Sequence, residues 1–274
     1  MTTAAPPQPS LPAYAVKRIG GTNWRGVWTL YLREVRRFIK VFLQTVLAPA
    51  VTTMLFLLIF TVAVGNRGQA TAGVAFGTFL VPGLIMMTIL QNAFANTSSS
   101  ILIGKVHGNI LDVLMPPLSA GELTFAFVMG GVTRGIICAV AVVVPAAFLV
   151  DMTVSHLWAI LYFSLAGSFM LSLLGAMTAI WADKFDHSAA INNFVIMPLS
   201  FLSGTFYSVE RLPAAAVVVS HFNPFFYLID GFRYGFIGTA DSHILVGVAV
   251  TLAVNVGLWL ATYTMFKTGY KLKA

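Results

Sequence analysis

Few side chains in this sequence could do chemistry, and they form no recognised catalytic pattern. Gly104-Lys105 lacks both the glycine-rich loop before it and the Ser or Thr after it that a Walker phosphate-binding loop requires. No His-Glu-x-x-His and no Gly-x-Ser-x-Gly sequence occurs. Asp183, Asp186 and His187 are close enough to suggest a metal site, but a polar turn between two helices accounts for them better. We therefore expect no catalytic residue, no metal and no cofactor in this chain.

The composition excludes several protein classes. Of 274 residues, 58% are hydrophobic and 9% are charged, whereas soluble domains have about 25% charged residues. An ordinary soluble enzyme and a disordered chain are thereby excluded. The single cysteine, Cys138, excludes a disulfide-built secreted domain. The net charge of +7 fits either nucleic acid or a membrane surface, and the positions of the basic residues must decide.

Apolar runs long enough to cross a bilayer, which takes about 20 residues, dominate the chain. We predict six spans, at about 41–64, 74–95, 131–150, 157–181, 189–207 and 244–266. The third run starts at 122, and placing its membrane part at 131–150 lets Arg134 reach the cytoplasmic interface. Residues 1–23 are proline-rich and have no apolar core, which predicts a disordered cytoplasmic tail before a membrane domain at 24–274.

Two further segments are predicted to be helical without spanning the membrane. On a helix over 24–42, one face collects Trp24, Trp28, Tyr31, Leu32, Val35, Phe38, Ile39 and Phe42, and the opposite face collects Arg25, Arg33, Arg36, Arg37 and Lys40. This pattern predicts an amphipathic helix in the headgroup plane, with packing on a protein partner as the alternative. Residues 212–219 and 224–238 are too short to span, so we predict a re-entrant helical hairpin there.

The basic residues bracket the predicted spans, which disfavours nucleic-acid binding. Arg67, Arg211 and Arg233 fall on one side and Arg134 in a span; the other twelve share the opposite side: Lys17, Arg18, Arg25, Arg33, Arg36, Arg37, Lys40, Lys105, Lys184, Lys267, Lys271 and Lys273. Because basic loops stay in the cytoplasm, both termini should be cytoplasmic. An even number of spans is then required.

The predicted spans contain almost no acidic residue, which argues against an ion-coupled transporter and against an ion channel. Energy for uphill transport should then come from another chain. The loop after the second span could receive it, because residues 98–115 can form a flat amphipathic helix ended by Pro116-Pro117. The candidate coupling residues are Lys105, His107, Asn109, Asp112, Leu114, Met115 and Pro116. The alternative is an interfacial loop without a partner.

The region before the last span could form an outer gate. Charges at membrane depth are costly, so Glu210, Arg211, Asp230 and Arg233 should pair, face water or meet a substrate headgroup. We expect Arg233 to pair with Asp230 or Glu210; the alternative places all four in the outer headgroup layer. The neighbouring aromatic residues Phe201, Phe206 and Tyr207 would suit a sugar or an acyl chain.

Several of these segments together resemble the membrane subunit of type-2 ABC exporters, and among them the YadH-like branch of drug, lipid and polysaccharide export permeases. The resemblance covers about 24–270. It rests on the basic amphipathic lead-in, GKVHGNILDVLMPPLS at 104–119, FLSGTFY at 201–207 with Leu212-Pro213, Asn223-Pro224 and Arg233.

The resemblance implies an all-α integral membrane fold of six spans per subunit, with a short re-entrant helix pair before the last span. It also implies a dimer of permeases over a dimer of ATPases, which bind ATP and Mg. Many relatives carry a Glu-rich coupling segment where this chain has Lys105, His107 and Asp112. We therefore predict a bacterial inner-membrane export subunit for an amphipathic or hydrophobic lipid, drug or glycan. A non-transport scaffold and a secondary transporter are the alternatives.

Overall fold

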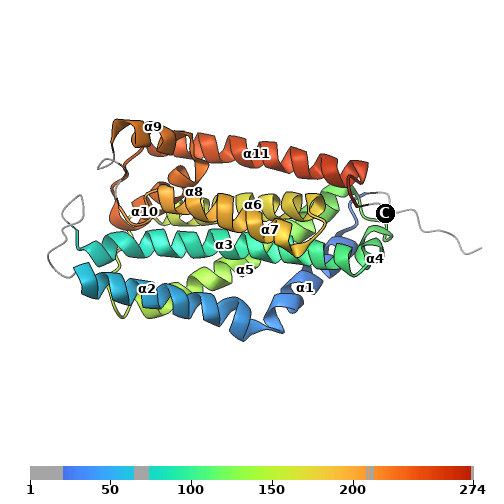
Figure 1. The fold of residues 1–274 in the computed structure, drawn as a ribbon, viewed down its shortest axis with the longest axis horizontal. Coiled ribbons are helices and arrows are strands. Elements are labelled where there is room, and N and C mark those ends of the chain that lie inside the picture. The colour runs from blue at the N-terminus through green and yellow to red at the C-terminus, as the bar shows by residue number, and fades with distance from the viewer. Residues whose placement is uncertain (1–20, 65–73, 208, 210–212, 273–274) are drawn as a thin grey trace, which may run out of the picture.

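The protein is a bundle of long helices that run along one axis (Figure 1). The computed structural model describes residues 21–64, 74–207, 209 and 213–272, and every regular element of more than one residue in them is a helix. The all-α prediction is therefore confirmed. The predicted tail at 1–23 lies outside the described residues except for its last three.

The amphipathic lead-in forms α1 (Trp24–Ile39), and its first turn is capped by Asn23, whose side chain accepts a hydrogen bond from the Gly26 amide. One face of this helix packs on the bundle, which the sequence analysis did not predict. It consists of Val27, Leu30, Glu34 and Phe38, and α1 packs mainly on α5. Trp24 and Trp28 are 68% and 59% exposed, so both tryptophans face away from the bundle. Arg37, which was expected on the basic lipid-facing surface, instead points inward and donates to the Asn96 carbonyl oxygen. The prediction missed this because it grouped residues by polarity and Glu34 was not considered.

The first predicted span is a five-residue π-helix, η1 (Leu43–Leu47), followed by α2 (Ala48–Val64). The second is α3 (Phe76–Val106), which continues eleven residues beyond the predicted end. The predicted span ended at 95, directly before the polar residues Asn96, Thr97 and Ser98. In the structure these side chains are buried between helices, where helix backbone and neighbouring polar groups satisfy several of them.

No single helix spans 98–115, which corrects the sequence prediction. Gly108 has φ +74°, a left-handed conformation that suits glycine and ends the α3 helix. A short helix, α4 (Ile110–Leu114), follows. The third span, α5 (Ala120–Ala146), begins eleven residues earlier than predicted, because Ser119 and Glu122 form a capping box.

The remaining helices follow the predicted order. α6 (Leu157–Trp181) matches its predicted range, and α11 (Ile244–Thr268) extends the last one by two residues. The fifth predicted span is a succession of α7 (Phe185–Ile191), the π-helix η4 (Asn192–Ile196) and α8 (Met197–Leu202). The two short segments predicted at 212–219 and 224–238 correspond to the helices α9 (Ala214–Phe222) and α10 (Pro224–Ile237), which are separated by Asn223. α9 and α10 lie at the end of the bundle opposite α4 and the C-terminus (Figure 1).

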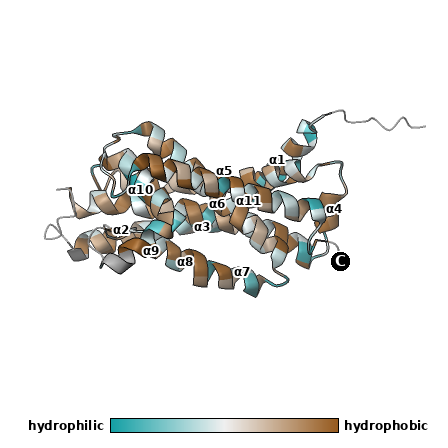
Figure 2. Ribbon diagram, turned by 90° about the horizontal axis from the view of Figure 1, so that it is seen from above, coloured by the Kyte–Doolittle hydropathy of each residue, from teal (hydrophilic) through white to brown (hydrophobic). Residues whose placement is uncertain are grey.

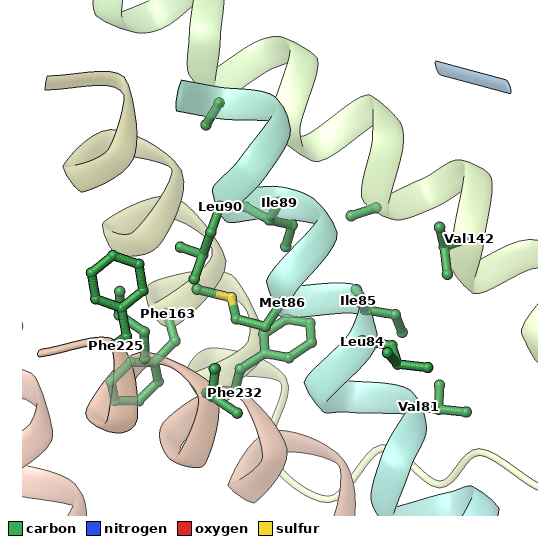
Figure 3. Close-up of a cluster of buried hydrophobic side chains, with 14 of the residues drawn as sticks. Val81, Leu84, Ile85, Met86, Ile89, Leu90, Val142, Phe163, Phe225 and Phe232 are labelled. Carbon is green, nitrogen blue, oxygen red and sulfur yellow. The ribbon is translucent and has the colours of Figure 1, made fainter. Parts of the chain in front are cut away.

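The centre of the bundle is α3, which packs on α6, α5 and α10. Met86 and Leu90 of α3 point toward Phe163 of α6 and toward Phe225 and Phe232 of α10 (Figure 3). Backbones approach closely where glycine allows it. A Cβ atom at Gly175 of α6 would lie 2.6 Å from the Phe94 carbonyl oxygen of α3.

Within the described residues, five helical stretches are long and apolar enough to cross a membrane: Leu43–Val62, Phe76–Val106, Ala120–Ala146, Leu157–Trp181 and Ile244–Thr268. The first and last bury the smallest share of their residues, and hydrophobic residues run along the helices in Figure 2. A large exposed apolar surface on long helices is that of an integral membrane protein.

Candidate functional site

Three segments far apart in sequence are joined at the end of the bundle that carries α4. The Lys105 ammonium group at the end of α3 donates to the carbonyl oxygens of Ile180 and Ala182, each at 2.6 Å, and of Ala179 at 3.3 Å. Asp183 accepts a hydrogen bond from Lys271 near the C-terminus at 3.1 Å. That bond holds the pKa of the exposed Asp183 carboxyl below its ordinary value. Lys105 is thus a structural clamp on α6 in the isolated chain.

An apolar cluster packs the helices together at the end of the bundle that carries α4. Its buried members come from α1, the end of α3, α4, the start of α5, the end of α6, the end of α11 and the C-terminal segment, and they include Val27, Leu30, Ile101, Leu102, Ile110, Val113, Leu123, Ala179, Ile180, Phe266 and Leu272. Asn23 also donates through its backbone amide to Glu122 and through its side chain to the Pro117 carbonyl oxygen. The start of α1, the loop after α3 and the C-terminal segment therefore share one end of the molecule.

The other coupling candidates lie on or beside α4. Ile110 and Val113 bury one face of this helix, and Leu114 packs partly against the same cluster. Met115 is 77% exposed, and Asp112, His107, Asn109 and Pro116 are also exposed. The exposed surface of α4 is therefore of mixed apolar and polar character, with Met115 as its most exposed apolar side chain.

Arg233 is buried at the opposite end, with 4% of its surface exposed. Its Nη2 donates to the Gly204 carbonyl oxygen at 2.5 Å, and its Cζ lies 3.9 Å from the centre of the Phe79 ring. Within the described residues it forms no salt bridge with Asp230, and the other expected partner, Glu210, lies outside them. The aromatic ring and the carbonyl oxygen compensate the guanidinium instead.

Asp230 has its own set of donors. Its carboxylate accepts hydrogen bonds from the Asp241 amide at 2.9 Å and from the Ser242 amide and hydroxyl at 2.9 and 2.6 Å. Asp230 therefore fixes the turn that leads from α10 into α11. Asp230 and Arg233 are both buried within the protein, and their depth relative to the headgroup layer stays a prediction. Glu210 and Arg211 lie outside the described residues.

The aromatic residues predicted near the outer end, Phe201, Phe206 and Tyr207, line two different grooves. Phe206 stacks on Phe201 of α8 with ring centroids 5.5 Å apart and lies 5.3 Å from Phe60 of α2. These rings bridge α2 and α8. Tyr207 instead lines a groove of about 680 Å³ between α6, α8, α9 and α11.

The Phe201–Phe206 pair lies at a second open groove, of about 720 Å³. Its walls come from η1 and α2 on one side and from α7, η4 and α8 on the other, and α3 lies between them. Ten of its 23 lining residues have uncharged polar side chains, and none of the described lining residues is charged. We call it the polar groove.

One polar cluster was missed by the sequence analysis. Glu34 of α1 is fully buried and lies 3.3 Å from Arg37, whose guanidinium also donates to the Asn96 carbonyl and side-chain oxygens and to Ser99 of α3. An acid three residues before an arginine on one helix is a readable signal for an ion pair. The amphipathic pattern concealed it by assigning Arg37 to the lipid side. Arg134, which was expected near the cytoplasmic interface, donates to Asn92 of α3 at 3.1 Å.

Known proteins resemble this chain over most of its length. The family profile described as "ABC-2 type transporter" matches residues 25–237. The chain belongs to the ABC-2 type transporter family. It is 33% identical over 252 residues to the inner membrane transport permease YadH of Escherichia coli K12, which covers 92% of this chain and 98% of that relative. It is 24% identical to nodulation protein J of Rhizobium leguminosarum bv. viciae over 84% of this chain and 88% of that protein.

Membership in the ABC-2 family confirms the resemblance drawn from the sequence. This ABC-2 chain is a multi-pass permease of the inner membrane and the membrane subunit of an ABC transporter. Such permeases are transport subunits that work with an ATPase partner and are not themselves enzymes. A probable multidrug ABC transporter permease of Escherichia coli K12, YbhS, is 24% identical over 69% of this chain and 48% of that protein.

Proposed function

We propose that this permease forms one half of an ATP-driven export path for an amphipathic or hydrophobic substrate. The observation that carries the proposal is the joining of 105, 179–183 and 271 at one end of the bundle, opposite the aromatic and hairpin segments. The end that carries α4 is therefore suited to bind the ATPase, and the end that carries α9 and α10 is suited to release the substrate.

The proposal includes six membrane crossings. α7, η4 and α8 follow one another from 185 to 202 without interruption. At about 1.5 Å per residue these residues extend about 27 Å, close to the hydrocarbon thickness of about 30 Å. With this crossing, the end that carries α4, Lys105 and Lys271 is cytoplasmic, and so are both termini.

Single-cysteine labelling tests this topology. In a Cys138→Ser background, a cysteine at the exposed position 270 should react with a membrane-permeant reagent and resist an outside-only reagent. A cysteine at the exposed position 151 should show the opposite accessibility. Labelling of position 270 from outside would refute the orientation.

Coupling to the ATPase is assigned to the surface of α4. Two permease copies would sit on two ATPase subunits, which bind ATP and Mg, and Met115 would enter an apolar cleft of the ATPase. Asp112 would meet a basic partner. Asp112→Lys should then uncouple ATP hydrolysis from export while the protein still inserts. The matched control is Asp151→Lys, which makes the same charge change at the opposite end. Unchanged export in Asp112→Lys would refute the assignment.

The outer gate is assigned to the Phe60, Phe201 and Phe206 rings together with α9 and α10 as a re-entrant hairpin. Phe206 links α2 to α8, so moving α8 away from α2 would open the polar groove at this end. ATP-dependent flux that requires the partner ATPase would exclude both a scaffold and a proton-driven secondary transporter. Mass spectrometry of co-purified ligand would identify the substrate.

A further inference from the structure

A continuous apolar furrow runs between α6, η4 and α11. The groove of about 680 Å³ that Tyr207 lines adjoins a second groove of about 730 Å³, which reaches the C-terminal ends of α6 and α11. The two grooves share the lining residues Leu174, Thr178, Ile191 and Val195, and we call them together the lateral furrow. Its lining on α6 runs from 170 to 181, about 16 Å at 1.5 Å per residue, which is close to one leaflet of a hydrocarbon layer of about 30 Å.

Protein side chains leave this furrow open. η4 packs mainly on α7 and α8, its neighbours in the chain, and only slightly on α6 and α11. The walls are largely apolar, with Leu174 on α6, Val195 on η4 and Leu258 on α11. Because the core of a bilayer contains no water, a lipid acyl chain is the occupant that matches such a furrow.

The furrow ends at an aromatic and basic rim. Trp181 and Tyr270 line this end, and tryptophan and tyrosine are typical of the headgroup level of a membrane. The Lys271 Nζ atom lies 5.6 Å from the centre of the Trp181 ring and donates to the Trp181 carbonyl oxygen and to Asp183, each at 3.1 Å. An ammonium group has three donors, so these two acceptors, the partners of Lys271 within the described residues, leave one donor for a phosphate oxygen.

The backbone fixes Lys271 at this rim. Gly269 ends α11 with φ +67°, and Lys271 itself has φ +51°, which is uncommon for a residue other than glycine. Leu272 is then buried in the apolar cluster of the same end. The segments around the rim carry the lysines Lys105, Lys184, Lys267 and Lys271 against the aspartates Asp183 and Asp186. A basic site between membrane helices is typical of binding to anionic lipid headgroups.

We propose that the lateral furrow holds one anionic phospholipid as a bound structural lipid, with its phosphate at Lys271 and an acyl chain along Leu174 and Val195. The lipid fills the space between η4 and α11 and thereby braces the segment 185–202. This inference goes beyond the proposed export function, because the lipid is not the exported substrate. Only its place in the cytoplasmic leaflet rests on the proposed orientation.

Native mass spectrometry of the purified permease tests the site, because it resolves bound lipids and permease copies together. The probes are phosphatidylglycerol, phosphatidylcholine and diacylglycerol with the same acyl chains. Phosphatidylglycerol should bind about tenfold more tightly than phosphatidylcholine, which corresponds to about 1.4 kcal/mol, and diacylglycerol should bind most weakly. Lys271→Gln should remove the preference for phosphatidylglycerol. Asp183→Asn should tighten its binding, because the carboxylate that competes for Lys271 is removed.

Two matched controls separate the site from general effects on the membrane surface. Val195→Trp fills the part that the two grooves share and should abolish binding of all three lipids, whereas Val140→Trp, at an exposed position of α5 outside the furrow, should bind as the wild type does. Lys40→Gln removes an exposed cation from another segment and should leave the preference unchanged.

Equal binding of phosphatidylglycerol and phosphatidylcholine would overturn the proposal, and so would unchanged binding in Lys271→Gln or Val195→Trp. Asp183→Asn and Val195→Trp decide the question if Lys271→Gln fails to fold. Glycerol 3-phosphate that binds as tightly as phosphatidylglycerol would indicate a soluble phosphate site instead. Loss of permease dimer in Val195→Trp, with lipid binding unchanged, would make the furrow an interface between copies.

The binding measurement is independent of transport. If the lipid binds as expected and the complex with the ATPase exports nothing, the export function fails and the lipid site stands. If the complex exports a substrate and no lipid binds in the furrow, the lipid site fails and the export function stands.

Discussion

The Lys105 Nζ atom lies 2.6 Å from the carbonyl oxygen of Ala182, so the last turn of α3 closes the end of α6. The C-terminal end of a helix leaves carbonyl oxygens without partners in the helix. A cation at that end also interacts favourably with the negative end of the helix dipole. Lys105 therefore links the segment before α4 to the start of α7. A displacement of α4 by a partner would reach α6 and α7 through this side chain.

Replacing Lys105 by Met should destabilise the permease. The variant loses three hydrogen bonds from a charged donor and leaves the end of α6 unsatisfied, at a cost of about 2 kcal/mol. The measurement is the fraction of folded protein after heating in detergent, followed by size-exclusion chromatography. Lys184→Met, at an exposed position in the turn after α6, should behave as the wild type does. Equal stability of the two variants would show that the Lys105 bonds contribute nothing.

Helix packing should be sensitive to a single methyl group at Gly131. A Cβ atom there would lie 2.3 Å from Ser172 Oγ, 2.5 Å from Thr97 Oγ1 and 2.9 Å from the Ala93 carbonyl oxygen. Gly131→Ala should therefore cost about 1–3 kcal/mol through overpacking. Gly257→Ala is the matched control on α11, where nothing lies within 4 Å of the added atom. The two variants can be compared by the same heating assay, and a stable Gly131→Ala protein would contradict the close approach.

Exchanging the charges of Asp230 and Arg233 should not restore function. Each group has separate partners, since Arg233 contacts Gly204 and Phe79 while Asp230 holds the 241–242 turn. Arg233→Glu and Asp230→Lys should each abolish export, and the double variant should be no better than either one. Export and surface expression would be measured together, with Asp151→Lys as a control for an added charge. Partial rescue in the double variant would indicate a direct ion pair.

The Glu34–Arg37 pair should show coupled mutational effects. Arg37→Met leaves the buried Glu34 carboxylate without its cation, which costs about 3–5 kcal/mol for buried pairs. Adding Glu34→Gln to that variant should recover part of the loss. The exposed neighbour Arg36→Met supplies the control. Additive effects of the two substitutions in a double-mutant cycle would mean that the pair contributes no coupling energy.

Most of the fold could be predicted from the sequence, because an apolar run of about 20 residues indicates a membrane-spanning helix. α6 matched its predicted range at both ends. α3 did not, because composition separates apolar from polar residues and cannot tell a polar side chain in water from one buried between helices. Asn96 is polar by composition yet fully buried. α5 begins earlier than its predicted span because the apolar run from 122 was shortened to the length that crosses a bilayer.

For the candidate site, the sequence predicted where residues lie along the chain better than which side chains they contact. Residues 105–116 were predicted to lie at one end of the bundle, and the structure places them together there. Arg233 was expected to pair with Asp230 or Glu210. Its contacts among the described residues, with Phe79 and Gly204, come from other elements, and no local pattern specifies contacts of that kind.

The position of α3 at the centre of the bundle has a consequence for biogenesis. It is the least apolar of the five candidate spans and the most buried, and Asn92, Asn96 and Thr97 all lie on it. Such a segment partitions poorly into lipid on its own. α5 and α6, which cover it, emerge from the ribosome later, so the nascent chain must retain α3 beside the insertion machinery until they arrive. Ribosome-bound chains truncated before 157 should therefore leave α3 accessible from the aqueous side.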